Sequence, residues 1–311
     1  MRTPGSPPTG SLRSPSPIAL PAAHELRRPA GVLRYTDVGA GPEVVCVHGN
    51  PTWAYHYRNL ITTLSPDHRV IVPDHLGMGR SDTPDAARYG YDLAARVDDL
   101  TALLDELAIG VETPATLIVH DWGGAIALAW ATRHPERVGR LVLCNTAAFP
   151  RLDDEPLPWL LQPARMPVLG PLLVQGANAF VRGALRIGVR RHRLPPEIRR
   201  GYLAPYRSWR DRRAVLAFVR DIPDRPSGPT HALLTETAAN LHQLADRPSL
   251  LLWGLRDPVL TPRYLTEWRR RLPYTETHVI ADAGHLVLED APETVPLIVA
   301  FLARTRGMLN G

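Results

Sequence analysis

The chain has 311 residues, of which 44% are hydrophobic and 22% charged, so it is long enough for a large globular domain with a buried core. All 36 residues counted as Lys or Arg are arginine, so the chain contains no lysine. Mechanisms that need a Schiff-base or phosphate-loop lysine are therefore excluded. The net charge is +5, but much of the excess lies between Arg182 and Arg213, without a basic motif interleaved with aromatics. No nucleic-acid partner is expected.

The two cysteines and the first residues bear on the compartment. Cys46 and Cys144 each fall inside a predicted buried strand, so no disulfide framework is indicated. Residues 1–25 are rich in Pro, Ser and Gly and lack the apolar stretch of a signal peptide, and no run long enough for a membrane span occurs. We expect a disordered tail over residues 1–25 on a soluble, cytoplasmic protein with no transmembrane segment.

After the tail, short apolar runs alternate with segments of helical spacing. Strands that alternate with helices favour an α/β fold with a mostly parallel sheet, covered by helices on both faces. The sequence predicts a hairpin over Gly31–Gly41, strands at Glu43–Val47, Val70–Val72, Leu117–Val119, Leu141–Cys144, Leu250–Trp253 and Thr277–Ile280, and helices at Trp53–Leu64, Leu93–Leu107, Ala125–Ala131, Pro262–Leu272 and Pro292–Ala303.

The pattern changes in the middle of the chain. Between about Thr146 and Ala245 there are many Pro and Arg residues, short helical stretches and no clear strand. We therefore expect an inserted helical cap at residues 146–245, which divides the α/β core into residues 26–145 and 246–311.

The stretch Leu117–Ala125 carries the strongest chemical signal. Aliphatic residues lead into Asp121, and two glycines then open an alanine-rich run, which is typical of a strand, a sharp turn and a helix. Val119 and Gly123 flank Asp121 as in the nucleophile elbow of α/β-hydrolases. A carboxylate nucleophile forms esters with alkyl carbon, so Asp121 predicts chemistry different from that of a serine hydrolase. The alternative, an Asp that merely caps a helix, needs neither the strand nor the glycines.

An Asp nucleophile on an elbow needs a base and a second acid. The hydrolase fold supplies them in the chain order nucleophile, acid, His. Asp257 follows the turn after the strand that ends at Trp253, and His285 lies in the loop after the last strand. Either residue alone is weak evidence, but three agreeing positions favour a catalytic triad of Asp121, Asp257 and His285.

Two further residues are candidates for stabilising negative charge. Asn50 follows a central strand, and its backbone N–H and that of Trp122 are expected to form an oxyanion hole, while the Asn50 amide and the Trp122 indole can donate to a leaving anion. A turn Asn and a packed Trp are the plainer alternatives. No histidine or cysteine spacing indicates a metal site, so neither a metal nor another cofactor is expected.

Several motifs resemble the haloalkane dehalogenase group of α/β-hydrolases, over nearly all of the chain after about residue 30. The core motifs are His48–Trp53 (HGNPTW), Pro73–Asp82 (PDHLGMGRSD), His120–Gly124 (HDWGG) and Asp282–His285 (DAGH). Three other segments are more similar to a subgroup that includes the β-lactone decarboxylase of bacterial long-chain olefin biosynthesis: Asn145–Pro150 (NTAAFP), Ala204–Trp209 (APYRSW) and Trp253–Asp257 (WGLRD).

The resemblance implies a role for each candidate residue. Asp121 would be the nucleophile, His285 the base and Asp257 the acid, while Asn50 and Trp122 would hold the leaving halide or carboxylate. In the subgroup, the implied reaction converts a cis-β-lactone with two long alkyl arms into a cis-alkene and carbon dioxide. Whether Asp121 attacks the ring carbon or the carbonyl stays open at this point.

The sequence leaves three enzymatic interpretations, in the order β-lactone decarboxylase, haloalkane dehalogenase and epoxide hydrolase. The epoxide hydrolase group places two cap tyrosines over the nucleophile, and Tyr202 and Tyr206 keep this alternative open. A ligand receptor derived from a hydrolase would be expected to have lost a member of the triad, and none is missing here.

The residues of the cap predict the kind of substrate and the kind of protein partner. Its apolar residues exceed what a small haloalkane could cover, which favours a hydrophobic substrate with long arms, although part of the set must form the cap's own core. The arginine-rich segment is expected to be a solvated face, or else to dock a neighbouring enzyme of olefin biosynthesis. The apolar cap residues are Leu160, Leu161, Leu169, Leu172, Leu173, Val174, Phe180 and Val181.

Overall fold

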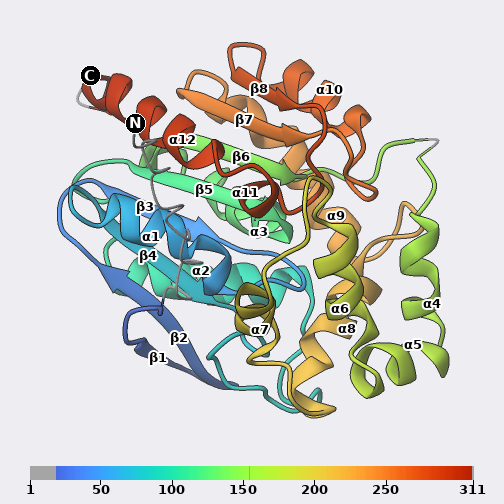
Figure 1. Ribbon diagram of the computed structural model, residues 1–311. Coiled ribbons are helices and arrows are strands. Elements are labelled where there is room, and N and C mark those ends of the chain that lie inside the picture. The colour runs from blue at the N-terminus through green and yellow to red at the C-terminus, as the bar shows by residue number, and fades with distance from the viewer. Residues whose placement is uncertain (1–18, 154, 310–311) are drawn as a thin grey trace, which may run out of the picture.

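In the computed structural model, which describes residues 19–153 and 155–309, the chain folds around one eight-stranded sheet (Figure 1). The spatial order is β1-β2-β4-β3-β5-β6-β7-β8. The β1–β2 and β2–β4 pairs are antiparallel and the other pairs are parallel, so the predicted mostly parallel sheet is confirmed. The strands are β1 (His24–Arg28), β2 (Gly31–Val38), β3 (Glu43–Val47), β4 (Arg69–Asp74), β5 (Ala115–Asp121), β6 (Val138–Thr146), β7 (Ser249–Gly254) and β8 (Glu276–Ile280).

Helices cover both faces of this sheet. On one face α1 lies on β4 and α12 on β7, and on the other α3 lies on β5 and β6 and packs against α2 and α9 (Figure 1). Because helices exclude water from both sides, the central strands are buried almost throughout and read as continuous apolar runs. The core helices are α1 (Arg58–Leu64), α2 (Leu93–Glu106), α3 (Trp122–Ala131), α9 (Pro229–Asn240), α10 (Pro262–Arg271), α11 (Val287–Asp290) and α12 (Thr294–Arg304).

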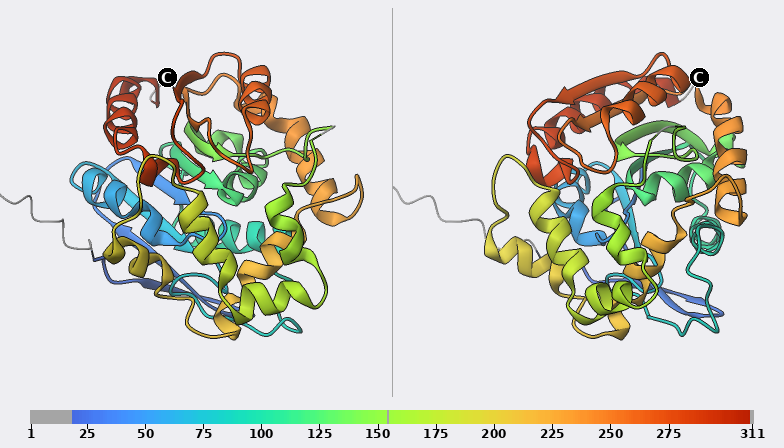
Figure 2. Two further views of the ribbon diagram at one scale, coloured as in Figure 1. Left: turned by 45° about the vertical axis from the view of Figure 1, so that its right-hand side comes forward. Right: turned by 90° about the vertical axis from the view of Figure 1, so that its right-hand side faces the viewer.

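A helical cap lies between β6 and β7 in the chain and beside the sheet in space (Figure 2). Two boundaries differ from the expected 146–245. β6 includes Thr146, and α9 lies against α2 and α3 because its buried side chains Leu233, Leu234 and Thr237 face the core. The cap helices are α4 (Gln162–Arg165), α5 (Leu169–Pro171), α6 (Ala179–Ile187), α7 (Pro196–Leu203) and α8 (Arg213–Asp221).

The amino-terminal region also differs from the prediction. β1 begins at His24, inside the expected tail, and pairs with β2 from His24 opposite Tyr35 to Arg28 opposite Gly31. The hairpin predicted over Gly31–Gly41 is thus displaced, because β1 is a half-exposed edge strand of mostly polar residues that gives no apolar signal. The tail prediction for residues 1–18 lies outside the described residues. Within 19–153 and 155–309, the helices include none that is long and apolar enough to span a membrane.

A buried ion pair fastens the cap to the core. Arg58 of α1 donates two hydrogen bonds to the carboxylate of Glu289 in α11, and both side chains are almost fully buried. The hydroxyl of Tyr202, on cap helix α7, donates to the same carboxylate at 2.6 Å. One carboxylate therefore joins two core helices and one cap helix.

We expect Glu289→Gln to destabilise the fold by about 3 to 5 kcal/mol, because it leaves the buried Arg58 guanidinium without its countercharge. Urea unfolding followed by circular dichroism measures this change. The matched control is Glu236→Gln, which breaks the exposed pair with Arg133 and should cost less than about 1 kcal/mol. Equal losses in the two variants would contradict the assigned importance of the buried pair.

Candidate active site

The turn from β5 to α3 presents Asp121 at the carboxyl edge of the sheet. Asp121 has φ 53° and ψ −127°, a conformation that a residue with a side chain rarely adopts. A Cβ at Gly123 would collide with the Val47 carbonyl, and one at Gly124 with the Thr146 hydroxyl. The two glycines after Asp121 thus let α3 begin directly against the neighbouring strands.

The structure brings the three predicted triad residues together. His285 lies in the loop after β8, and its Nδ1 is 2.7 Å from Oδ2 of Asp257 in the loop after β7. Its Nε2 is 3.5 Å from Oδ2 of Asp121. All three side chains are largely buried, so they interact with little screening by water. This arrangement places one imidazole between two carboxylates.

Asp257 is held in place by hydrogen bonds to both of its oxygens. The backbone N–H groups of Val259 and Leu260 donate to Oδ1 at 2.8 and 3.0 Å. The Asn145 amide donates to Oδ2 at 2.9 Å, and its own oxygen accepts from the N–H of Gly254. Asn145 is part of the motif Asn145–Pro150 in the sequence, but its contact with Asp257 was not predicted. Its signal was a polar residue near the carboxyl end of a strand that is buried throughout.

The charges of the triad are coupled. Burial alone would raise the pKa of the Asp121 carboxyl, but His285 and the N–H of Asn50 hold it below its usual value. Burial alone would lower the pKa of His285, but Asp257 and Asp121 raise it to about 10. The resting site is therefore an imidazolium between two carboxylates. Esterification of Asp121 would remove one negative charge and so lower the pKa of His285.

Asn50 contacts Asp121 directly. Its backbone N–H donates to Oδ1 of Asp121 at 2.6 Å, and its amide donates one hydrogen bond to the carbonyl of Val215 at 3.2 Å. The predicted oxyanion-hole N–H of Asn50 is thus occupied by the Asp121 carboxylate in this structure. The amide has a second N–H, and Trp122 lines the cavities in front of Asp121.

A row of buried histidines lies behind the triad. The ring of His120 is 4.7 Å from that of His285 and 4.5 Å from that of His56. Its Nε2 is 2.9 Å from the backbone oxygen of His285. Burial lowers the pKa of His120 to about 4, so the ring is neutral and donates to that carbonyl. His120 fixes the backbone that carries His285, a role that sequence reasoning missed. In the part of the chain that the structure describes, His, Cys, Asp and Glu form no group of three or more suited to a metal ion.

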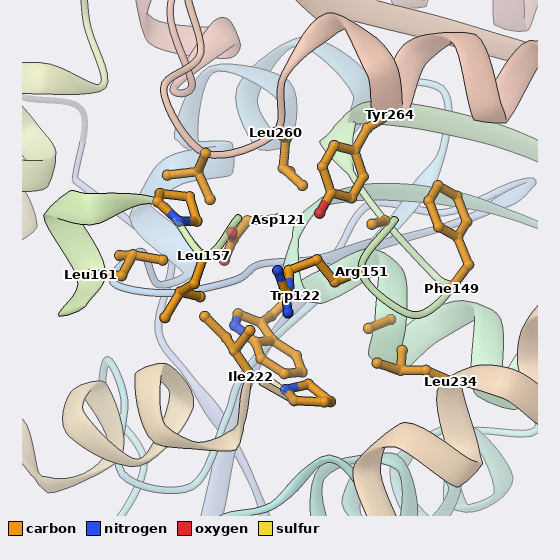
Figure 3. A pocket seen from close by; sticks show the side chains of 15 residues that line it. Asp121, Trp122, Phe149, Arg151, Leu157, Leu161, Ile222, Leu234, Leu260 and Tyr264 are labelled. Carbon is orange, nitrogen blue, oxygen red and sulfur yellow. The ribbon is translucent and has the colours of Figure 1, made fainter. Parts of the chain in front are cut away.

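Two apolar cavities meet at Asp121 and Trp122. The core cavity, of about 110 Å³, is lined by Phe149, Leu157, Leu234 and Tyr264 (Figure 3). The cap cavity, of about 310 Å³, is lined by residues that include Leu160, Phe180, Gly183 and Ile187.

Only some of the apolar cap residues that were expected to contact the substrate line the two cavities. Leu160, Leu161 and Phe180 line the cap cavity, as expected. Val174 and Val181 instead belong to the cap's own core. Leu169 and Leu172 are exposed, at 38% and 55%.

The comparisons with known proteins agree with this geometry. The model of the alpha/beta hydrolase fold family matches residues 42–292. This chain is an α/β hydrolase. The hydrolase is 46% identical to a cis-3-alkyl-4-alkyloxetan-2-one decarboxylase of Shewanella oneidensis, over 88% of this chain and 85% of that one. It is also 46% identical to a decarboxylase of the same name from Xanthomonas campestris pv. campestris, over 89% of this chain and 94% of that one.

A solved structure shows the similarity to haloalkane dehalogenases. The crystal structure of a haloalkane dehalogenase from Bradyrhizobium elkani matches this hydrolase with a TM-score of 0.79 at 28% identity, over 92% of this chain and 98% of that one. Both resemblances predicted from the motifs, to β-lactone decarboxylases and to haloalkane dehalogenases, are therefore confirmed.

We expect His285 to keep its proton until the pH rises through about 10, because two carboxylates favour the charged ring. Asp257→Asn removes the charge that contributes most, so the pKa should fall toward the ordinary value of about 6.5. Titration of the His285 ring followed by NMR measures both values. Asp282→Asn is the control, since Asp282 is exposed and pairs with Arg191 instead. An unchanged pKa in Asp257→Asn would show that Asp257 does not set the charge of His285.

Proposed function

We propose that this hydrolase is a cis-β-lactone decarboxylase, which converts a cis-3-alkyl-4-alkyloxetan-2-one into a cis-alkene and carbon dioxide. The observation that carries the proposal is the 46% identity to two decarboxylases of this kind over at least 88% of the chain, against 28% to the dehalogenase structure. Apolar cavities in front of Asp121 support it, because alkyl arms gain about 0.8 kcal/mol for each methylene that they bury.

In the proposed reaction, Asp121 opens the lactone ring. Its ionised carboxylate attacks the saturated ring carbon that bears the ring oxygen and one alkyl arm, and a new C–O bond forms with inversion at that carbon. The ring C–O bond breaks, so the ring oxygen leaves as part of a carboxylate that stays attached to the neighbouring carbon. We assign the second N–H of the Asn50 amide and the Trp122 indole N–H as donors to this carboxylate.

The ester then breaks down without water. The carboxylate loses carbon dioxide, the electrons of that C–C bond form the double bond, and Asp121 departs with the electrons of its C–O bond. Inversion followed by departure of the two groups from opposite sides keeps the two arms cis. A protonated His285 beside Asp121 would stabilise the departing carboxylate, and Asp257 would hold the imidazolium in place.

Attack at the carbonyl carbon does not lead to the alkene. It would produce an anhydride and an alkoxide, and hydrolysis of the anhydride would give a hydroxy acid. The chemistry of the product therefore favours attack at the ring carbon, as an Asp nucleophile directs it.

The runner-up function is that of a haloalkane dehalogenase, which the similarity to the Bradyrhizobium enzyme supports. In that reaction His285 would activate water to hydrolyse the Asp121 ester. Epoxide hydrolysis has less support, because the two cap tyrosines bond elsewhere. The Tyr202 hydroxyl donates to Glu289, and that of Tyr206 donates to the carbonyl of Thr52.

The origin of the oxygens of Asp121 distinguishes these functions. We expect turnover of a long-armed cis-β-lactone in heavy-oxygen water to leave both oxygens of Asp121 unlabelled, because the proposed ester breaks at the substrate carbon without hydrolysis. Mass spectrometry of the peptide that contains the elbow, combined with gas chromatography of the alkene, measures label and product together.

Asp121→Ala is the matching variant, and it should form no alkene while keeping the fold, which circular dichroism checks. Label in Asp121 together with halide release from haloalkanes and no alkene would establish the dehalogenase instead. Alkene formation by Asp121→Ala would disprove the role of Asp121 as nucleophile.

We also propose that the arginine-rich segment from Arg182 to Arg213 docks an acidic face of a neighbouring enzyme of olefin biosynthesis. Support comes from a surface hollow that Arg186, Arg190, Arg193 and Arg199 line. Pull-down with purified upstream enzymes should succeed at low salt and fail as the salt is raised. Capture that ignores salt, or no capture at all, would favour a solvated face.

A further inference from the structure

The two cavities diverge from a shared floor. Asp121 and Trp122 line both of them, together with Leu161, Ile222 and Val259. Beyond this junction the core cavity runs toward Phe149, Leu234 and Tyr264, which come from the loop after β6 and from α9 and α10 (Figure 3). The cap cavity runs under α6, past Phe180, Gly183 and Ile187. The nucleophile thus stands where two separate apolar spaces meet.

We infer that the cap cavity and the core cavity are two binding sites, each of which takes one alkyl arm of the same substrate. This inference rests on the proposed function and adds the place of each arm. The two arms of a cis-lactone leave adjacent ring carbons, one of them the carbon under attack, so each arm can turn into its own cavity. Seating each arm in its own cavity fixes the ring at the junction, in front of Asp121.

The cavities differ in size and in how they end. The cap cavity, at about 310 Å³, is nearly three times as large as the core cavity, at about 110 Å³. Arg151 lines the core cavity and donates to the backbone oxygens of Glu155 and Asp224. Arg151 and Pro223 also line a hollow on the outer surface, so the core cavity ends just below that surface. The arm in the core cavity therefore has the stricter length limit.

One substitution can fill each cavity. Gly183 lines the cap cavity, and a Cβ there would meet no atom outside its own helix within 4 Å, so Gly183→Trp is chosen to place a ring in that cavity. Ala147 lines only the core cavity, and Ala147→Leu reduces that smaller space. Gly307→Trp is the matched control, because a Cβ there also meets no atom within 4 Å and the residue is exposed and far along the chain.

The test measures binding of alkenes, so it does not depend on turnover. Equilibrium dialysis against cyclodextrin-solubilised alkene, quantified by gas chromatography, gives the affinity. One probe is a cis-alkene with a long arm for the cap cavity and a shorter arm for the core cavity, and the other carries only the shorter arm, opposite a methyl group. A two-armed probe needs both cavities, whereas a one-armed probe needs either one.

Each single variant, Gly183→Trp or Ala147→Leu, should weaken binding of the two-armed alkene at least about tenfold, since displacing only two methylenes has this effect. Each should bind the one-armed alkene as the wild type does, which also shows that the variant is folded. The double variant should lose both probes, and Gly307→Trp should lose neither.

If Gly183→Trp alone removes the one-armed probe while Ala147→Leu changes nothing, both arms share the cap cavity and the inference is overturned. That outcome would leave the core cavity to a polar group beside Arg151. Conversion of the lactone by the wild type is assayed in parallel. Failure there with the expected binding pattern would reject the proposed reaction and retain the two sites.

Discussion

The site depends on a backbone constraint at Asp121. A residue with positive φ between a strand and a helix turns the chain within one position, and this is possible here only because no side chain follows at Gly123 and Gly124. The strain of such a residue, of the order of 1 to 3 kcal/mol, is maintained by the packed ends of β3 and β6 around it. The Asp121 side chain is thereby fixed by the core of the sheet.

The electrostatics of the site follow from burial. In water, two carboxylates beside an imidazole would interact weakly, but in this enclosed edge of the sheet they determine its protonation. The neutral histidines behind the triad complete the arrangement, since His120 supports the His285 backbone without adding a second positive charge. The fold thus keeps a proton on His285, next to the Asp121 carboxylate, across the neutral pH range.

Much of the fold followed from local patterns, because buried parallel strands are apolar runs and the elbow has a short signature. β1 was not predicted, because an edge strand of mostly polar residues has no apolar run. The position of α9 was not predicted either, because a helix that packs on the core and one that packs in the cap have similar apolar faces. The contacts of Asn145 and His120 join the ends of strands to distant loops. No spacing in the sequence encodes these pairs.

The bond between Tyr202 and the Arg58–Glu289 pair has a consequence for how a large ligand reaches the nucleophile. Separating α7 from the core would expose a buried charge pair to water, which is costly. This side of the cap therefore stays attached to the core. At the other side Trp159 lines the cap cavity and is 79% exposed, and among residues 19–153 and 155–309 no buried ion pair involves it. A water-insoluble ligand would therefore enter beside this indole, which offers an apolar surface at the doorway before any contact with the nucleophile is made.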